Sequence, residues 1–150
     1  MRLAKGGGSF AGVKTKAAVL RQMELPHPYT ESRPLSIEEV DLDGPGENEV
    51  LVQVAGAGLC HSDLSVINGS RPRPVPMVMG HEAAGVVRDI GPGVKGLVPD
   101  DHVVFSFVPC CGGCPMCAVG RAPLCEPAYE AAVTGQLLHG GRRFTVSGGE

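Results

Sequence analysis

Four cysteines follow one another at C-x2-C-x2-C-x7-C spacing, a pattern typical of a metal site: Cys111, Cys114, Cys117 and Cys125. A two-residue gap that contains glycine or proline lets the chain turn back, so that both sulfur atoms of a pair face one point. Zn²⁺ binds four thiolates tetrahedrally, and a site with four protein ligands has no open position for substrate. The spacing therefore predicts a structural zinc lobe at residues 110–125, whose folding depends on the metal.

Two other interpretations of these cysteines are a pair of disulfides and a redox-active Cys-x-x-Cys. Disulfides need an oxidising compartment, and residues 1–8 contain no apolar segment of a secretory signal. A redox dithiol needs a thioredoxin-like setting, in which a third and fourth cysteine in register are not expected. The sequence therefore favours zinc thiolates, and we expect a cytoplasmic protein.

A second candidate metal site combines Cys60 and His81, which are each flanked by polar residues beside a bend of the backbone. A catalytic zinc ion takes three protein ligands and keeps one position open, so this pair supplies two of the three. Asp63 can receive the second ring N–H of His81, and Glu82 would place a carboxylate near the metal. Ser62 offers a hydroxyl that can pass a proton outward. Taken singly, a cysteine is more often a small buried hydrophobe, so the residue types alone leave both interpretations open.

The composition excludes some classes of function. The 150 residues carry a formal net charge of -3 and only 4% aromatic residues, which argues against a nucleic-acid partner and gives no attraction to anionic membranes. No apolar run approaches the ~18 residues that cross a bilayer. The length allows one hydrophobic core, so we expect one domain.

Short valine-rich runs between glycine and proline clusters predict a mainly β domain with many turns. A short helix is expected from an N-cap at Ser62 or Asp63 toward Asn68, and a helical turn at Glu126–Ala132. The expected strands are Lys16–Leu20, Pro34–Leu42, Glu49–Ala55, Ala83–Ile90, His102–Val108, Thr134–Leu138 and Arg142–Val146. The glycine-rich residues 1–15 are expected to be a disordered lead-in.

The segment Gly91–Gly96 matches the G-x-G-x-x-G pattern of dinucleotide-binding loops. Such a loop must open a helix whose N-terminus holds the pyrophosphate. Here the chain continues into Pro99–Asp101 and an expected strand, so the pattern predicts a turn between two strands.

Three motifs in this chain together resemble the zinc-dependent alcohol dehydrogenases of the medium-chain dehydrogenase/reductase superfamily. They are Gly-Leu-Cys-His-Ser-Asp-Leu at 58–64, Gly-His-Glu-Ala-Ala-Gly-Val-Val at 80–87, and the cysteine motif at 111–125. The resemblance runs from about Lys14 to the end of the sequence. It implies that residues 16–150 form an incomplete GroES-like β-barrel catalytic domain, that residues 110–125 are its structural zinc lobe, and that a Rossmann cofactor domain lies beyond Glu150.

The same resemblance implies a role for each candidate residue. Cys60 and His81 match two ligands of a catalytic zinc, Glu82 a nearby acid, Ser62 a proton-relay hydroxyl, Asp63 the partner of the ligand histidine, and His61 a contact to the cofactor pyrophosphate. The four cysteines of the lobe match structural zinc ligands. The implied activity is hydride transfer between an alcohol and NAD or NADP, which yields an aldehyde or ketone, with zinc as the Lewis acid. A small-molecule alcohol or aldehyde is the implied substrate, and a full-length enzyme is expected to form homo-oligomers.

The chain departs from the family pattern at three positions. Ser65 stands where many members have a second relay histidine, Asp100 replaces a glycine in a turn, and Cys110 is an extra thiol that we expect to be a bystander. The third catalytic ligand is expected further downstream, so the 150 residues alone are expected to be inactive. The alternative hypothesis is a non-enzymatic zinc-binding β-domain.

Overall fold

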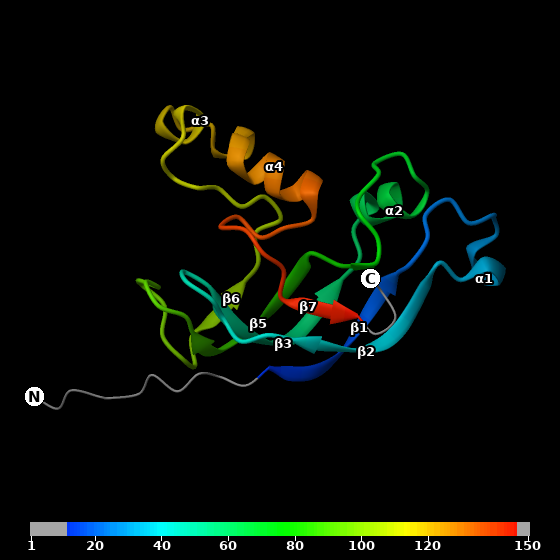
Figure 1. The fold of residues 1–150 in the computed structure, drawn as a ribbon, viewed down its shortest axis with the longest axis horizontal. Helices are drawn as coiled ribbons and strands as arrows, with labels where there is room; N and C mark the ends of the chain where they lie inside the picture. Colours follow the sequence, from blue (N-terminus) through cyan, green and yellow to red (C-terminus); the bar gives the residue numbers. More distant parts are fainter. Residues whose placement is uncertain (1–11, 147–150) are drawn as a thin grey trace, which may run out of the picture.

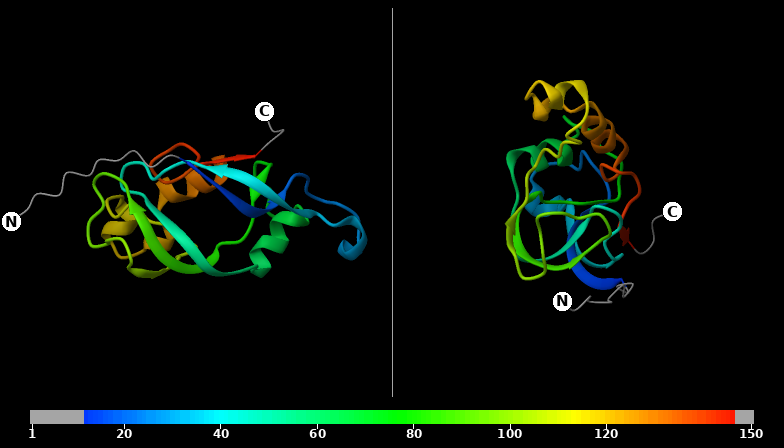
Figure 2. Two further views of the ribbon diagram at one scale, coloured as in Figure 1. Left: turned by 90° about the horizontal axis from the view of Figure 1, so that it is seen from below. Right: turned by 90° about the vertical axis from the view of Figure 1, so that its left-hand side faces the viewer.

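The computed structural model describes residues 12–146 as two curled antiparallel sheets with a helical lobe standing over them (Figure 1). One sheet has the strand order β4-β1-β2-β7, with bounds Met77–Val78, Val13–Leu20, Leu35–Leu42 and Phe144–Val146. The other has the order β3-β5-β6, with bounds Val50–Gly58, Glu82–Ile90 and His102–Val104. The two sheets curl around a common interior, as the views in Figure 2 show. The predicted mainly β architecture is confirmed.

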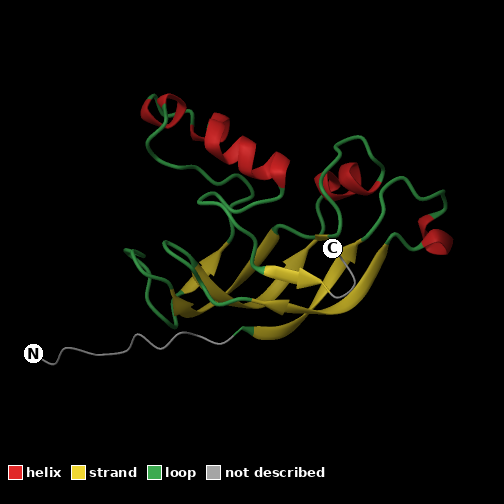
Figure 3. Ribbon diagram, in the orientation of Figure 1, coloured by secondary structure: helices red, strands yellow, loops and turns green. Residues whose placement is uncertain are grey.

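The helices lie between and beyond the strands and are short. Their bounds are Tyr29–Ser32 for α1, His61–Ile67 for α2, Pro115–Ala118 for α3 and Glu126–Thr134 for α4, with a 3-10 turn, η1, at Ala122–Leu124. Figure 3 shows that α2, α3 and α4 stand on the same side of the strands. Within residues 12–146, no helix has the length and apolar character that a membrane crossing needs.

In the hydrophobic core, α2 packs against the sheet that contains β1. Leu20 at the end of β1 packs with Val66 and Ile67 of α2 and with Met79, and all four are at most 6% exposed. Burial of each such side chain stabilises the fold by about 1.5–3 kcal/mol. Because α2 carries its apolar residues at its C-terminal end, this packing fixes the position of its N-terminal end, where Cys60 precedes the helix.

Strand β2 shows how the pleat decides which apolar residue is buried. Val40 is 1% exposed, whereas Ile37 is 73% exposed. Residues three apart in a strand point to opposite faces, so these two cannot share the interior. The predicted strand is confirmed, but Ile37 is not part of its buried face.

The expected boundaries of β1 and β6 are corrected. Strand β1 begins at Val13 rather than Lys16, so the expected lead-in is shorter; its first eleven residues lie outside the described residues. Strand β6 ends at Val104 rather than Val108, because pairing with β5 stops after Phe105 N–H donates to the Ala83 carbonyl. Beyond that point the Ser106 hydroxyl donates to the Val108 carbonyl, which a ladder would otherwise use.

The expected strand Thr134–Leu138 is wrong. Helix α4 continues to Thr134, Gly135 ends it with φ 67°, and Gln136 N–H donates to the Ala131 carbonyl. The backbone groups are therefore used by the helix terminus. The strand expected at Arg142–Val146 is present as β7, which begins at Phe144 and pairs with β2.

The segment Gly91–Gly96 is a turn, as predicted, and opens no helix. Gly91 N–H donates to the Glu49 carbonyl, and a Cβ at Gly91 would overlap the carbonyl oxygen of Gly46. Gly93 has φ 82°, a left-handed conformation that favours glycine. These glycines therefore serve a tight turn rather than a phosphate.

Candidate metal centres

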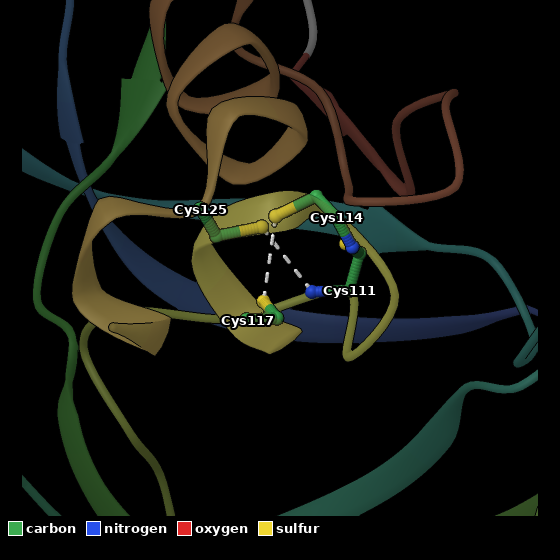
Figure 4. A group of neighbouring side chains, drawn as sticks. All are labelled: Cys111, Cys114, Cys117 and Cys125. Atoms are coloured by element: carbon green, nitrogen blue, oxygen red, sulfur yellow. Dashed lines mark hydrogen bonds between the residues drawn. The ribbon is translucent and has the colours of Figure 1, made fainter. Parts of the chain in front are cut away.

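The four cysteines of the lobe converge on one point between the α3 loop and the start of α4 (Figure 4). One sulfur atom from each of Cys111, Cys114, Cys117 and Cys125 lies within 4.8 Å of all the others, and the Sγ atoms of Cys114 and Cys117 are 3.5 Å apart. A tetrahedral zinc–thiolate site with bonds of about 2.3 Å separates its sulfur atoms by about 3.8 Å. The donor set and its spacing therefore fit zinc.

Local backbone structure places these sulfur atoms. Cys114 precedes α3 and Cys125 precedes α4, and each helix has a proline in its first turn, where the missing N–H is tolerated. Gly112 has φ 76°, which turns the chain between Cys111 and Cys114. Cys125 is buried, so the lobe closes over the cluster from the side of α4.

Backbone N–H groups donate hydrogen bonds to these sulfur atoms even in the absence of a metal. Cys117 N–H lowers the pKa of the Cys114 thiol from its ordinary 9.0 to about 6. Burial and the neighbouring Cys114 thiol raise the pKa of Cys117 to about 12. Backbone hydrogen bonding thus favours the thiolate form of Cys114, burial favours the thiol form of Cys117, and zinc binding must release the protons that the thiols still carry.

A second group of donors lies at the junction of α2 and β5. Cys60 is the N-cap of α2, His81 follows β4, and Glu82 begins β5. One donor atom from each lies within 4.8 Å of the other two. The structure thus places the Glu82 carboxylate close enough to Cys60 and His81 to share a metal ion with them. Thiolate, imidazole and carboxylate donors therefore converge here, a set that suits zinc.

Asp63 connects the two segments that carry these donors. Its carboxylate accepts hydrogen bonds from Cys60 N–H at 2.8 Å and Gly80 N–H at 3.3 Å. Its Oδ1 atom lies 3.4 Å from Nδ1 of His81. A proton on Nδ1 would face this carboxylate, so that Nε2 of His81, which lies 3.3 Å from Ser62 Oγ, would be the nitrogen that can bind a metal.

The expected N-cap at Ser62 or Asp63 is corrected by this geometry. Cys60 is the N-cap, its sulfur faces the backbone N–H of Asp63, and the Asp63 side chain reaches back to Cys60 N–H. This reciprocal pair is a capping box with cysteine in place of serine. The sequence did contain a signal for this N-cap that was missed: Cys60 and Asp63 stand at the spacing of a capping box.

Ser62 and His81 face two cavities. Ser62 Oγ lies 3.3 Å from His81 Nε2, and both residues line a cavity of about 910 Å³ and a second of about 560 Å³. Phe107, to which the sequence assigned no role, also lines both, and its ring centroid is 4.2 Å from that of His81. The donors of the second centre therefore lie beside space that can admit a small molecule.

His61 lies apart from these cavities. It is the first residue of α2, is exposed, and lines neither cavity. Ser65, one turn further, donates from its hydroxyl to the His61 carbonyl at 3.2 Å. The extra thiol of Cys110 is exposed and does not belong to the group of four sulfur atoms.

Comparison with protein families and with curated proteins shows similarity to alcohol dehydrogenases. The family described as the alcohol dehydrogenase GroES-like domain matches residues 46–148. The chain is 46% identical, over 136 residues, to an NDMA-dependent alcohol dehydrogenase of Amycolatopsis methanolica, which covers 91% of this chain and 34% of that protein. The chain thus spans about a third of the length of the curated relatives it matches.

Solved structures show the same similarity. An alcohol dehydrogenase zinc-binding domain protein from Burkholderia ambifaria superimposes with a TM-score of 0.79 at 37% identity, over 93% of this chain and 35% of that one. A cobalt- and zinc-bound thermostable alcohol dehydrogenase from Pyrobaculum aerophilum gives 0.66 at 34% identity, over 76% and 33%.

Proposed function

The chain belongs to the zinc-dependent alcohol dehydrogenase family, and from this premise we propose that it forms the zinc-binding catalytic part of an oxidoreductase. The complete enzyme would interconvert an alcohol and an aldehyde or ketone by hydride transfer with NAD or NADP. The observation that carries this proposal is the convergence of Cys60, His81 and Glu82 beside the cavities. A second zinc, held by the four cysteines of the lobe, would be structural.

The residues around the second centre suit this chemistry. We propose that Cys60 and His81 hold the catalytic zinc, with Glu82 as a third donor within reach. A bound zinc would supply Lewis-acid polarisation of the substrate oxygen. Asp63 would orient His81 through Nδ1, as carboxylates commonly do for histidine ligands.

Proton transfer is the proposed role of Ser62. Its hydroxyl lies 3.3 Å from His81 Nε2 and lines both cavities, so it can take a proton from a substrate hydroxyl that lies there. Beyond Ser62 the relay must use water or substrate groups, since Ser65 hydrogen-bonds to the helix backbone. His61, exposed at the start of α2, is the proposed contact for the cofactor pyrophosphate.

The remaining expectations stand as proposals. All six cysteines are free, which suits a reducing, cytoplasmic location. The complete enzyme would act on small-molecule alcohols or aldehydes and form homo-oligomers. We propose that residues 1–150 alone do not turn over; the G-x-G-x-x-G pattern at Gly91–Gly96 forms a turn and opens no helix that could hold a pyrophosphate.

The test uses the complete protein that contains this chain. Alcohol oxidation is followed through NAD(P)H absorbance for the wild type, Cys60→Ser and the matched control Cys110→Ser. The proposal expects turnover in the wild type and the control and its loss, by at least about 100-fold, in Cys60→Ser. Equal turnover of all three would show that Cys60 holds no catalytic metal. Zinc binding without turnover would favour the non-enzymatic zinc-binding β-domain.

A further inference from the structure

The cavity of about 910 Å³ beside Ser62 and His81 carries an excess of positive charge. Four arginines and two carboxylic acids line it. One acid, Asp63, is 4% exposed and is engaged by Cys60, Gly80 and His81. The other, Glu126, begins α4, next to Cys125. The lining of the proposed substrate site therefore holds more cationic than anionic side chains.

Three of the four arginines have acceptors within the described residues. Arg143 forms a two-pronged ion pair with Glu49, at 2.7 and 3.2 Å. Arg142 donates to the carbonyls of Thr134 and Gly135, where it compensates the C-terminal end of α4. Arg73 donates to the carbonyl of Pro72. These three side chains therefore serve the fold, at least in part.

Arg71 differs, because its guanidinium contacts a ring instead of an oxygen. Its Cζ atom lies 5.6 Å from the ring centroid of Phe107, and no side-chain hydrogen bond or ion pair of Arg71 occurs in the part of the chain from 12 to 146. Phe107 in turn packs on His81 at 4.2 Å. One aromatic ring therefore connects the guanidinium to the second metal centre.

We propose that Arg71 binds a carboxylate at the far end of the substrate, so that the preferred substrates are alcohols or aldehydes with an anionic terminus. The proposal rests on the proposed function of the same site. A guanidinium presents five N–H donors in a planar fork that matches a carboxylate, and the placement of Arg71 over the Phe107 ring uses none of these donors for a hydrogen bond. The apolar residues Leu124 and Tyr129, which line the same cavity, would contact the chain between the two ends of the substrate.

The experiment compares three alcohols of matched chain length on the complete enzyme: an unbranched primary alcohol, an ω-hydroxycarboxylate and an ω-amino alcohol. The wild type should prefer the ω-hydroxycarboxylate. Arg71→Gln should lower kcat/KM for that substrate by about 10- to 100-fold, mainly through KM, and leave the neutral alcohol unchanged. Arg71→Glu should shift the preference to the ω-amino alcohol.

The matched control is Arg121→Gln, which removes an exposed arginine of the lobe that does not line the cavity. It should leave all three substrates unaffected. High salt should lower kcat/KM for the ω-hydroxycarboxylate more than for the neutral alcohol. Equal kcat/KM for charged and neutral alcohols in the wild type, or an equal loss for both in Arg71→Gln, would overturn the proposal.

Two further measurements distinguish carboxylate binding by Arg71 from failure of the proposed function and from binding of a cofactor phosphate. Binding of a short alkanoate, which cannot be oxidised, is measured by NMR titration of wild type and Arg71→Gln. Alkanoate binding that depends on Arg71 in a protein that oxidises no alcohol would refute the proposed function and retain the anion site. A cofactor phosphate is the other candidate anion: if Arg71→Gln weakens NAD or NADP binding and leaves the alcohol preference unchanged, the carboxylate proposal is wrong.

Discussion

The Oδ1 atom of Asp63 lies 3.4 Å from the Nδ1 atom of His81, and Asp63 is only 4% exposed. The same carboxylate accepts backbone hydrogen bonds from Cys60 and Gly80. One buried side chain thus holds the segments on both sides of the second metal centre. The core packing of α2 on β1 sets the distance between those segments.

Asp63→Asn should weaken both the fold and the second centre. Asparagine presents one oxygen and one NH₂ group, so one N–H donor that now faces Asp63 would lose its acceptor. We expect a loss of about 1–3 kcal/mol in the free energy of unfolding and a 10- to 100-fold lower zinc affinity at the second centre. Urea unfolding and zinc titration measure the two effects.

The control for that variant is Asp41→Asn, a residue of β2 whose side chain is exposed. Among residues 12–146, Asp41 forms one side-chain ion pair, with Lys14 at 3.1 Å on the surface, so its loss should change the unfolding free energy by at most about 0.5 kcal/mol. Equal effects of the two substitutions would contradict the role assigned to Asp63.

Cys114→Ser should remove the zinc of the lobe. Its sulfur lies 3.5 Å from Cys117 Sγ within the group of four, and its lowered pKa favours the thiolate form that a metal binds. Cys110→Ser, four residues earlier, should leave the zinc content unchanged, since Cys110 is outside the group. Zinc per chain, measured by plasma mass spectrometry, distinguishes the two; the same content in both variants would refute the site.

The ion pair between Glu49 and Arg143 should make stability depend on pH. Arg143 is the main cause that lowers the pKa of Glu49 below its ordinary 4.5, and the Glu49 side chain is 17% exposed. Because the folded-state pKa is the lower one, this contribution is fully present above pH 4.5 and is lost as the pH falls through the folded-state value.

Glu49→Gln should therefore lower the free energy of unfolding by about 1–2 kcal/mol at pH 7 and by much less at pH 3. Glu47→Gln, which neutralises a neighbouring exposed carboxylate, is the matched control and should have no such effect. Urea midpoints at both pH values give the comparison. A difference between Glu49→Gln and wild type that is constant with pH would contradict the ion pair.

The sequence predicted the lobe well because its signal is local. The x2 gaps and Gly112 act within a few residues of each cysteine, so spacing alone indicates that the sulfur atoms meet. The second centre was harder, because Cys60 and His81 are brought together by α2 packing on β1 and by the buried Asp63. The residue types alone left the pairing of Cys60 with His81 open, and the resemblance to a family was what favoured it before the structure was known.

Other features could not be predicted from the sequence, and the structure shows the physical reason for each. Phe107 reaches His81 only because β6 stops pairing at Val104 and the chain turns away. Thr134 and Val133 have good strand propensity, but α4 extends through them and Gly135 ends it. Asp100, which replaces an expected glycine, adopts φ 76°; its backbone N–H donates to the Val87 carbonyl at 2.9 Å, and its carboxylate accepts from Arg88 at 2.9 Å. At Phe107 and Asp100, contacts with residues distant in sequence decide the structure, whereas at Thr134 the continuation of α4 outweighs strand propensity.

Zinc K-edge X-ray absorption on protein purified under reducing conditions measures the metal environment directly. We predict tightly held zinc with four sulfur ligands at about 2.3 Å, and in the complete enzyme a further zinc with mixed sulfur, nitrogen and oxygen ligands. A protein that contains no zinc, and whose unfolding temperature is unchanged by a chelator, would contradict the account.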